Sequence, residues 1–453
     1  GNLEDGDVTI PVVENVVLLR GTAAAPIRHV TFTGFHFAHA EQDGIILDGA
    51  DQCAVTACTF RHLGGVAVNA GFARNAAKGV GNAWRRGPRP RTRIHSGDRS
   101  LCRGTPATGC RIAGNDIDSV GSDGIILVGN ANTADNNHIL RVGQYDMVCA
   151  GVTVYGDENR VSHNEISDLT YSGISVGWDW GYGPSSAHHN IVEYNHIHRI
   201  GRGHLSDMGG IYTLGISTGT VLRYNLIHDL HCYKYGATAL YQDQASSAML
   251  LENNIPRTCQ TGGYTLHYGR DNIVRNNIFA FGVSHQISLG RPEEHQQMTF
   301  ERNLIYYVDG NLTGHKWNQG TFAADRNLYW DATGEPVKWA GQSLQQWREE
   351  TKRDTGSVVA DPEFANAEKG DFSMPADSPA IQLGFVPIDM SRVGLYGDAK
   401  WTGLPAQAKA MPMEPTPDIV SFTDDYEGTP VGQLPGSFRV HGEIPGAGIR
   451  VTD

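Results

Sequence analysis

The sequence lacks several features that would place it in a common class of protein. No apolar run approaches the roughly 18 residues of a membrane-spanning helix, so we expect no membrane span. Positive charge is scarce, because 36 lysines and arginines stand against 49 acidic residues and leave a net charge of −13. This balance disfavours a polyanionic nucleic acid as a partner.

Cysteine pairs and helix signals are also missing. The seven cysteines are scattered and include no Cys-x-x-Cys pair, so neither a disulfide framework nor a cysteine-based zinc site is expected. Capped stretches of helix length are nearly absent from the middle of the chain, where Gly, Asn and Asp fill the gaps between short apolar segments. The chain starts with Gly1, which we interpret as a processed or truncated start.

One short pattern returns throughout this middle region. It has an apolar residue, two variable positions, an Asn, one more position and a second apolar residue. Nine copies, 22 to 31 residues apart, place the asparagines at Asn115, Asn137, Asn164, Asn195, Asn225, Asn253, Asn277, Asn303 and Asn327. Cys58 occupies the same slot in an earlier copy. Units this short cannot hold a core of their own, so successive units must stack and bury a shared one.

The repeat unit is strand-like, since apolar and polar residues alternate over four to six positions. Strands that recur without crossover helices predict an all-β parallel β-helix, with the asparagines as an inward ladder. A leucine-rich repeat would show a Leu-x-x-Leu-x-Leu frame, which is missing, and a propeller blade needs about 40 residues.

The pattern divides the chain into segments. The β-helix is predicted over residues 1–401, with a cap at about 331–401 that contains one short helix N-capped by Ser343. An irregular Arg-rich insertion at 74–111 is interpreted as a solvated loop rather than a grip on an acidic glycan. Residues 402–417 are predicted as a linker, and 418–453 as the start of a β-sandwich-like segment.

The longest coils predict the functional face, because loops on a rigid solenoid carry function. Stacked side by side, these loops should form a wall of Trp178, Asp179, Trp180, Tyr182, His204, Asp207, Tyr212, Tyr235, Tyr241, Asp243, His267, Tyr268 and Arg291. Aromatic rings stack on sugar faces, and two carboxyl groups are the minimum for glycoside cleavage. Asp207 and Asp243, on adjacent coils, are the predicted catalytic pair.

Histidines crowd the same region. They are His188, His189, His196, His198, His204, His228 and His231. The pairs His188–His189 and His196–His198 are compatible with metal ligation, but a metal site needs a third converging ligand. A hydrogen-bonded, partly buried role is therefore favoured, and no metal or other cofactor is predicted.

Several strings resemble glycoside hydrolase family 141 and related bacterial right-handed β-helix proteins. They include GISVGWDWGYGPSSAHHNIVEYNHIHRIGRGHLSDMGGIYTLG, YQDQASS, HYGRDNIVRNNIFAF and DFSMPADSPAIQLGF, and the resemblance covers roughly residues 110 to 400. It implies a right-handed, pectate-lyase-like solenoid with α-L-fucosidase or xylanase activity, and it matches Asp207 and Asp243 to catalytic positions. The chain departs from the family at Gln244, where an acid is typical, and at Thr265 to His267, where the family often has His-Gln-His.

Three functions follow from this sequence. The first is a glycosidase acting on a plant-type or algal polysaccharide, expected to be monomeric and secreted or periplasmic. The second is a polysaccharide lyase, in which Arg291, His267 and a Ca²⁺ bound by Asp179 would serve. The third, prompted by Gln244, is a non-catalytic glycan-binding protein.

Overall fold

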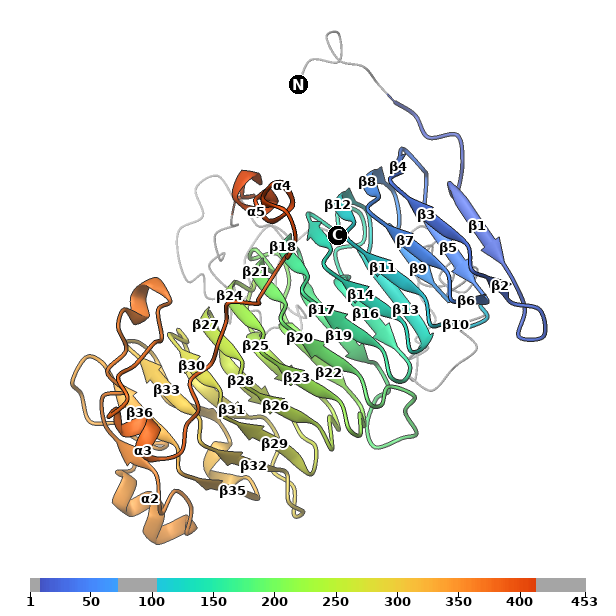
Figure 1. Cartoon of the computed structure of the whole chain (residues 1–453). Coiled ribbons are helices and arrows are strands. Elements are labelled where there is room, and N and C mark those ends of the chain that lie inside the picture. The colour runs from blue at the N-terminus through green and yellow to red at the C-terminus, as the bar shows by residue number, and fades with distance from the viewer. Residues whose placement is uncertain (1–8, 72–103, 413–453) are drawn as a thin grey trace, which may run out of the picture. The chain divides into compact units, whose positions relative to one another are not determined.

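The computed structural model describes residues 9–71 and 104–412, which form a solenoid of three parallel sheets (Figure 1). Most turns contribute one strand to each sheet, and hydrogen-bonded neighbours come from successive turns. The predicted parallel β-helix is therefore confirmed.

The three sheets contain 14, 11 and 12 strands. Sheet 1 is formed by β1 (Val17–Arg20), β2 (Ile27–Arg28), β5 (Ile45–Asp48), β6 (Ala50–Asp51), β9 (Val68–Ala70), β10 (Ala107–Thr108), β13 (Ile125–Asn130), β16 (Ala150–Tyr155), β19 (Ser172–Gly177), β22 (Met208–Leu214), β25 (Ala237–Gln242), β28 (Gly262–Leu266), β31 (His285–Leu289) and β34 (Asn311–His315). Sheet 2 is formed by β3 (Thr31–Thr33), β7 (Ala54–Thr56), β11 (Arg111–Ala113), β14 (Thr133–Asp135), β17 (Arg160–Ser162), β20 (Ile191–Glu193), β23 (Val221–Arg223), β26 (Leu250–Glu252), β29 (Asn272–Arg275), β32 (Met298–Glu301) and β35 (Phe322–Asp325). Sheet 3 is formed by β4 (His36–Ala38), β8 (Thr59–Leu63), β12 (Asp116–Val120), β15 (His138–Leu140), β18 (Glu165–Leu169), β21 (His196–Ile200), β24 (Leu226–Leu230), β27 (Ile255–Cys259), β30 (Ile278–Ala280), β33 (Leu304–Tyr307), β36 (Leu328–Asp331) and β37 (Val358–Val359).

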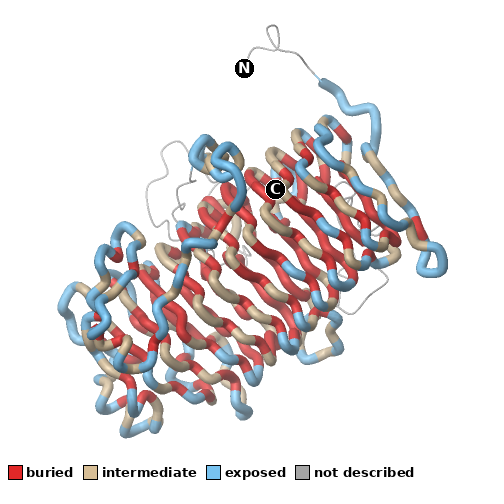
Figure 2. The backbone as a smooth tube through the Cα atoms, in the orientation of Figure 1, coloured by how far each residue is buried: buried red, intermediate tan, exposed pale blue. Residues whose placement is uncertain are grey.

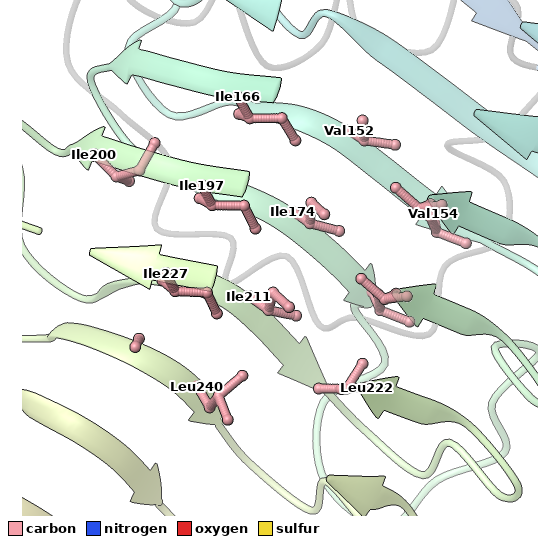
Figure 3. Close-up of a cluster of buried hydrophobic side chains, with 14 of the residues drawn as sticks. Val152, Val154, Ile166, Ile174, Ile197, Ile200, Ile211, Leu222, Ile227 and Leu240 are labelled. Atoms are coloured by element: carbon pink, nitrogen blue, oxygen red, sulfur yellow. The ribbon is translucent and has the colours of Figure 1, made fainter. Parts of the chain in front are cut away.

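The core runs along the inside of the solenoid (Figure 2). Equivalent apolar side chains from successive turns lie in register, as Ile166, Ile197 and Ile227 do on three neighbouring strands of sheet 3 (Figure 3). All three are fully buried. Burial of one such side chain contributes about 1.5–3 kcal/mol, so the stacked columns supply the main stabilisation.

An asparagine ladder fixes the corner between sheets 2 and 3. The Asn225 side-chain oxygen accepts the backbone N–H of Asn195 at 3.1 Å and its side-chain amide at 3.0 Å. The same geometry recurs from Asn115 to Asn327, and the N–H of Cys58 joins the ladder by donating to Asn115. The predicted inward ladder is confirmed.

One position of the predicted ladder is wrong. Asn254, not Asn253, is the ladder residue, because its side-chain oxygen accepts from Asn225 while it lies fully buried. Asn253 takes a left-handed backbone conformation, with φ of 56°, one residue before the ladder. Asparagine tolerates that conformation well, so an Asn-Asn pair satisfies both positions.

A second ladder lies at the corner between sheets 1 and 2, and the sequence analysis missed it. Asn132 accepts from the N–H of Cys110, Asn159 from Asn132, and Asn190 from Asn159. Thr220 then accepts from Asn190. Each member stands five positions before a member of the first ladder, and this constant spacing is the signal in the sequence that identifies it.

The C-terminal strap, residues 386–412, returns along the outside of the solenoid (Figure 1). Its contacts begin at Val386, bonded to Asn276, reach Asn136 through Tyr396, and end at Pro412, whose carbonyl accepts from Arg202. It carries the short helices α4 (Ala399–Thr402) and α5 (Leu404–Gln407), so the first part of the predicted linker is structured. The rest of that linker and the segment 418–453 lie outside the described residues.

Three other helices of the described residues belong to the predicted cap. They are α2 (Leu344–Thr351), η6 (Ala367–Lys369) and α3 (Pro379–Gln382). The short helix η5 (Trp317–Gln319) follows β34 and lies before the predicted start of the cap. The α2 N-cap is Ser343, whose hydroxyl accepts from the N–H of Gln346, as predicted. Among the described residues, no helix combines the length and apolar character needed to cross a bilayer.

Most of the Arg-rich insertion lies outside the described residues. Its last part does not, because β10 and β11 already belong to the solenoid before the predicted end at residue 111. All six described cysteines are free and buried.

The adjacent residues Asn253 and Asn254 provide a matched test of the ladder. Asn254→Ala removes an amide that bonds Leu222, Glu252 and Asn277, and leaves buried backbone groups unpaired. We expect it to lower the free energy of unfolding by about 3 kcal/mol or more, measured from urea denaturation. Asn253→Ala should cost about 1 kcal/mol, because only the left-handed preference and one partly buried contact, from the side-chain amide of Asn276, are lost. Equal losses in the two variants would contradict the assignment.

Candidate functional site

Two carboxylates define the candidate site, and both lie at the ends of neighbouring strands of sheet 1. Asp207 directly precedes β22 and Asp243 directly follows β25. Asp207 has a φ of +60° and is packed against Gly236. A Cβ on Gly236 would lie 2.6 Å from the Asp207 Cα, so only glycine allows this close approach.

Two tyrosines connect the carboxylates. The Tyr241 hydroxyl donates to Asp207 Oδ1 at 2.9 Å, and the Tyr212 hydroxyl donates to Asp243 Oδ2 at 2.7 Å. The rings of Tyr212 and Tyr241 are register partners and stack with centroids 4.6 Å apart. We call Asp207, Asp243, Tyr212, Tyr241 and His267 the paired-aspartate site.

His267 completes the surroundings of Asp243. Its Nδ1 lies 2.6 Å from Asp243 Oδ1, on the opposite oxygen from Tyr212. Asp243 is 4% exposed, so its carboxylate depends on these two partners rather than on water. The two contacts, one to each oxygen, therefore fix the orientation of this carboxylate.

Asp207 is in a different electrostatic environment. Burial raises its pKa, and the nearby charge of Asp243 raises it further, while the hydrogen bond from Tyr241 opposes both effects. Two carboxyl groups with different environments can divide acid and base roles between them.

Two further tyrosines lie beside the carboxylates. Burial raises the pKa of Tyr171 and of Tyr235, and the charges of both Asp207 and Asp243 add to the shift in each case. Tyr235 belonged to the predicted wall, but Tyr171 did not. Tyr171 directly precedes β19, and no other site residue lies at that end of β19 to mark it in the sequence. Only the fold therefore reveals its position.

The predicted aromatic and basic residues extend the site outward. The Trp178 ring lies 5.0 Å from Tyr212, and the Arg291 guanidinium lies 3.3 Å from the centroid of the Tyr268 ring. Arg291 also forms an ion pair of 2.7 Å with Glu293, and the hydroxyl of Tyr182 bonds to that same glutamate. Glu293 was not predicted.

The remaining predicted wall residues are Asp179, Trp180 and His204. Asp179 packs its backbone against Gly215 after β22, and Trp180 is 46% exposed. His204 lies in the turn that leads to Asp207.

The positions at which this chain departs from family 141 can now be placed. The side-chain oxygen of Gln244 accepts a hydrogen bond from the Tyr268 hydroxyl at 3.1 Å. Gln244 therefore contacts an aromatic residue of the predicted wall and lies next to the site. Leu266 points into the core and is fully buried. Thr265 is the register partner of Tyr241 and bonds to Ser288 at 2.8 Å, so only Thr265 and His267 of that triplet lie on the outer face.

Metal ligands do not converge on these carboxylates within the described residues. The one group of three convergent ligands there is Glu165, His196 and His198, which lie on sheet 3.

Comparison with known proteins identifies the fold family. The family model of the right-handed β-helix region matches residues 15–181 and 150–311 of this chain. This chain belongs to the right-handed β-helix family. Among curated proteins, none matches the sequence.

Solved structures that resemble this right-handed β-helix protein are distant. A glycoside hydrolase has 17% identity and a TM-score of 0.42, covering 66% of this chain and 51% of its own. A mannuronic acid specific family 6 polysaccharide lyase from human gut microbiota has 14% identity and a TM-score of 0.48, and the match covers 87% of this chain and 91% of the lyase. A lacto-N-biosidase from Eubacterium ramulus has 12% identity and a TM-score of 0.43, and the match covers 69% of this chain and 59% of the biosidase. This chain thus spans about half of the first, and likenesses at this level carry no inference about the reaction.

The raised pKa of Asp207 predicts a pH-dependent stability effect. Ionising this buried carboxyl costs stability as pH rises above the ordinary aspartate value of about 3.9, and the cost is absent below it. Asp207→Asn cannot ionise, so thermal melts should show it more stable than the wild type at pH 7, with the difference vanishing near pH 3.

Asp116→Asn provides a control of opposite sign. Burial alone would raise the pKa of Asp116, but hydrogen bonds and charge from His138 and Arg61 outweigh it and lower the pKa. Its replacement should therefore lower the melting temperature at pH 7. A destabilised Asp207→Asn at pH 7 would contradict the electrostatic description of the site.

Proposed function

We propose that this protein is a glycoside hydrolase that cleaves a plant-type or algal polysaccharide. The observation that carries the proposal is the paired-aspartate site, in which two carboxyl groups from neighbouring strands, linked through the stacked rings of Tyr212 and Tyr241, have contrasting environments. Glycoside cleavage needs one carboxyl group that holds a proton and one that is charged. Asp207 has the raised pKa that suits the first role, and Asp243 has the two hydrogen-bond donors that suit the second.

The reaction can be assigned to these groups step by step. Asp207 donates its proton to the glycosidic oxygen as the bond to the anomeric carbon breaks. Asp243 either removes a proton from the attacking water or attacks the anomeric carbon itself, and water then releases the sugar. Inversion corresponds to the first route and retention to the second, so the anomer of the initial product identifies the role of Asp243.

The surrounding aromatic residues support a sugar substrate. Trp178 and Tyr235 offer ring faces near the carboxylates, and pyranose rings stack on such faces. Trp180, two residues after Trp178, is exposed. The narrower assignment to an α-L-fucosidase or xylanase of family 141 rests on the sequence resemblance and belongs to this proposal. A polysaccharide substrate is found outside the cell, which supports a secreted or periplasmic location.

The lyase alternative receives less support from the contacts of the site. A lyase needs a cation or arginine free to neutralise a uronate. Arg291 is instead paired with Glu293 and packed on Tyr268, and His267 is held by Asp243. Products that absorb as unsaturated uronates would overturn the hydrolase proposal in favour of a lyase.

Replacement of either aspartate tests the catalytic pair. Asp207→Asn and Asp243→Asn should each lower kcat by roughly 10²–10⁴-fold, because the proton donor or the charged partner is lost. Release of reducing sugar from a panel of pectic, xylan and fucosylated glycans measures the loss. Asp157→Asn removes a surface carboxylate that pairs with His189 and should retain activity.

These variants also distinguish the third function. Full activity in both aspartate variants would refute the assignment. A wild-type protein that binds these glycans without turnover would be a glycan-binding protein.

Tyr241→Phe tests which carboxyl group is the acid. The hydrogen bond from Tyr241 lowers the pKa of Asp207, so its loss should raise that pKa. A proton donor with a higher pKa stays protonated to higher pH, and the basic limb of the kcat/KM profile should move upward. A shift of the acidic limb alone would instead assign Asp207 as the base. Tyr306→Phe, on sheet 3, is a suitable control.

A further inference from the structure

A second cluster of ionisable side chains lies on sheet 3, apart from the paired-aspartate site on sheet 1. It consists of Glu165 on β18, His196 and His198 on β21, and His228 on β24. The register pairs Glu165 with His196, and His198 with His228. Three successive turns of the solenoid therefore meet in this cluster.

Glu165 joins two of the imidazole rings. Its Oε2 lies 2.8 Å from His196 Nδ1, and its Oε1 lies 2.6 Å from His198 Nε2. Glu165 is 3% exposed and His198 is 6% exposed, so the carboxylate is removed from water. One carboxylate and two imidazoles whose ligand atoms converge within 4.8 Å are a donor set that suits zinc-like divalent ions.

The hydrogen bonds of the cluster require one more positive charge than neutral rings provide. His228 Nδ1 lies 2.8 Å from Asp229 Oδ2, and His228 Nε2 lies 2.8 Å from His196 Nε2. Together with the contact from His196 to Glu165, three contacts each need one proton. Two neutral imidazoles carry only two protons. The row of contacts is therefore complete only with an added proton or a bound cation.

A neighbouring histidine gives a second, independent observation. His138 on β15 is the register partner of Glu165 and is 4% exposed. Its Nδ1 bonds to Asp116 at 2.9 Å, but its buried Nε2 has no hydrogen-bond partner among the described residues. Buried polar atoms are nearly always paired, so an unpaired nitrogen beside the cluster points to a missing ligand such as a metal-bound water.

We propose that Glu165, His196 and His198 bind a divalent transition-metal ion of the zinc type. The ion takes the place of the missing proton at His196 Nδ1. His196 Nε2 then donates to His228, and His228 Nδ1 donates to Asp229, which is the usual outer support of a metal-bound histidine. Three protein ligands leave one position of a tetrahedral site for water.

Small adjustments accompany binding. Ligand atoms on a tetrahedral zinc ion are roughly 3.3 Å apart, so the contacts to Glu165 must open by about half an ångström. His198 must also carry its proton on Nδ1, which Arg199 faces at 3.0 Å. Arg199 keeps its two bonds to Asp168, at 2.8 and 3.0 Å, when it releases that ring.

The position of the cluster assigns the ion a stabilising role. The strap passes over it, because a Cβ on Gly394 would lie 3.5 Å from Glu165 Oε2 and 3.6 Å from the His196 Cβ. An ion here would join two turns directly, through β18 and β21, and a third through the contact from His196 to His228 on β24. This inference is independent of the proposed hydrolase activity.

Metal titration of the full chain tests the site. Protein stripped with a chelator is titrated with Zn²⁺, the bound metal is measured by elemental analysis, and Co²⁺ is used as a spectroscopic probe. We expect one ion per chain, nitrogen and oxygen ligation in the Co²⁺ spectrum, and a higher melting temperature with Zn²⁺. Each of these should be lost in His196→Ala/His198→Ala.

His189→Ala is the matched control, since it removes another histidine paired with a carboxylate, at Asp157, and should keep full stoichiometry. Glu165→Gln, which preserves the shape of the side chain, replaces the double variant if that one does not fold. The proposal is overturned if the wild type binds no Zn²⁺, if the variants retain it, or if Co²⁺ shows sulfur ligation.

Discussion

The asparagine amides at the corners of the solenoid hold its turns in register. In the ladder between sheets 2 and 3, from Asn137 to Asn327, each side-chain oxygen receives a backbone N–H and a side-chain amide from the preceding turn, as Asn225 does from Asn195. The same amide nitrogen returns a bond to the backbone, from Asn225 to Val192. Buried polar groups that are fully paired in this way tolerate no slip. Loops of very different length can therefore be inserted between corners without disturbing the stack.

Register in turn builds the site. Tyr212, Tyr241 and Thr265 occupy equivalent outward positions on three successive strands, so their spacing is set by the sheet. The two aspartates stand where the strands of sheet 1 begin and end, and the tyrosines reach from the rigid sheet to both. A site supported by strands holds its reacting groups more precisely than one supported by loops alone.

The same stacking buries a group of ionisable side chains on sheet 3, which is energetically unfavourable unless they are paired. Neighbouring turns bring Glu165 into contact with His196 and His198, which follow it by 31 and 33 residues in the sequence. Ionisable groups in a buried column must be paired, protonated or bound to an ion. A solenoid can thus carry two unrelated polar clusters on two of its faces, because each face has its own column of side chains.

The sequence by itself determined the repeat, the parallel β-helix and the inward ladder, since these depend on local alternation and on period. The tertiary structure decided which asparagine of the pair at 253 and 254 enters the ladder, because a backbone conformation separates them. It also revealed the second ladder, where cysteine and threonine replace asparagine at some positions. It further placed Tyr171 beside the two aspartates and Glu165 beside His196 and His198. Contacts between turns depend on loop paths that no local pattern encodes, so only the folded chain brings those side chains together.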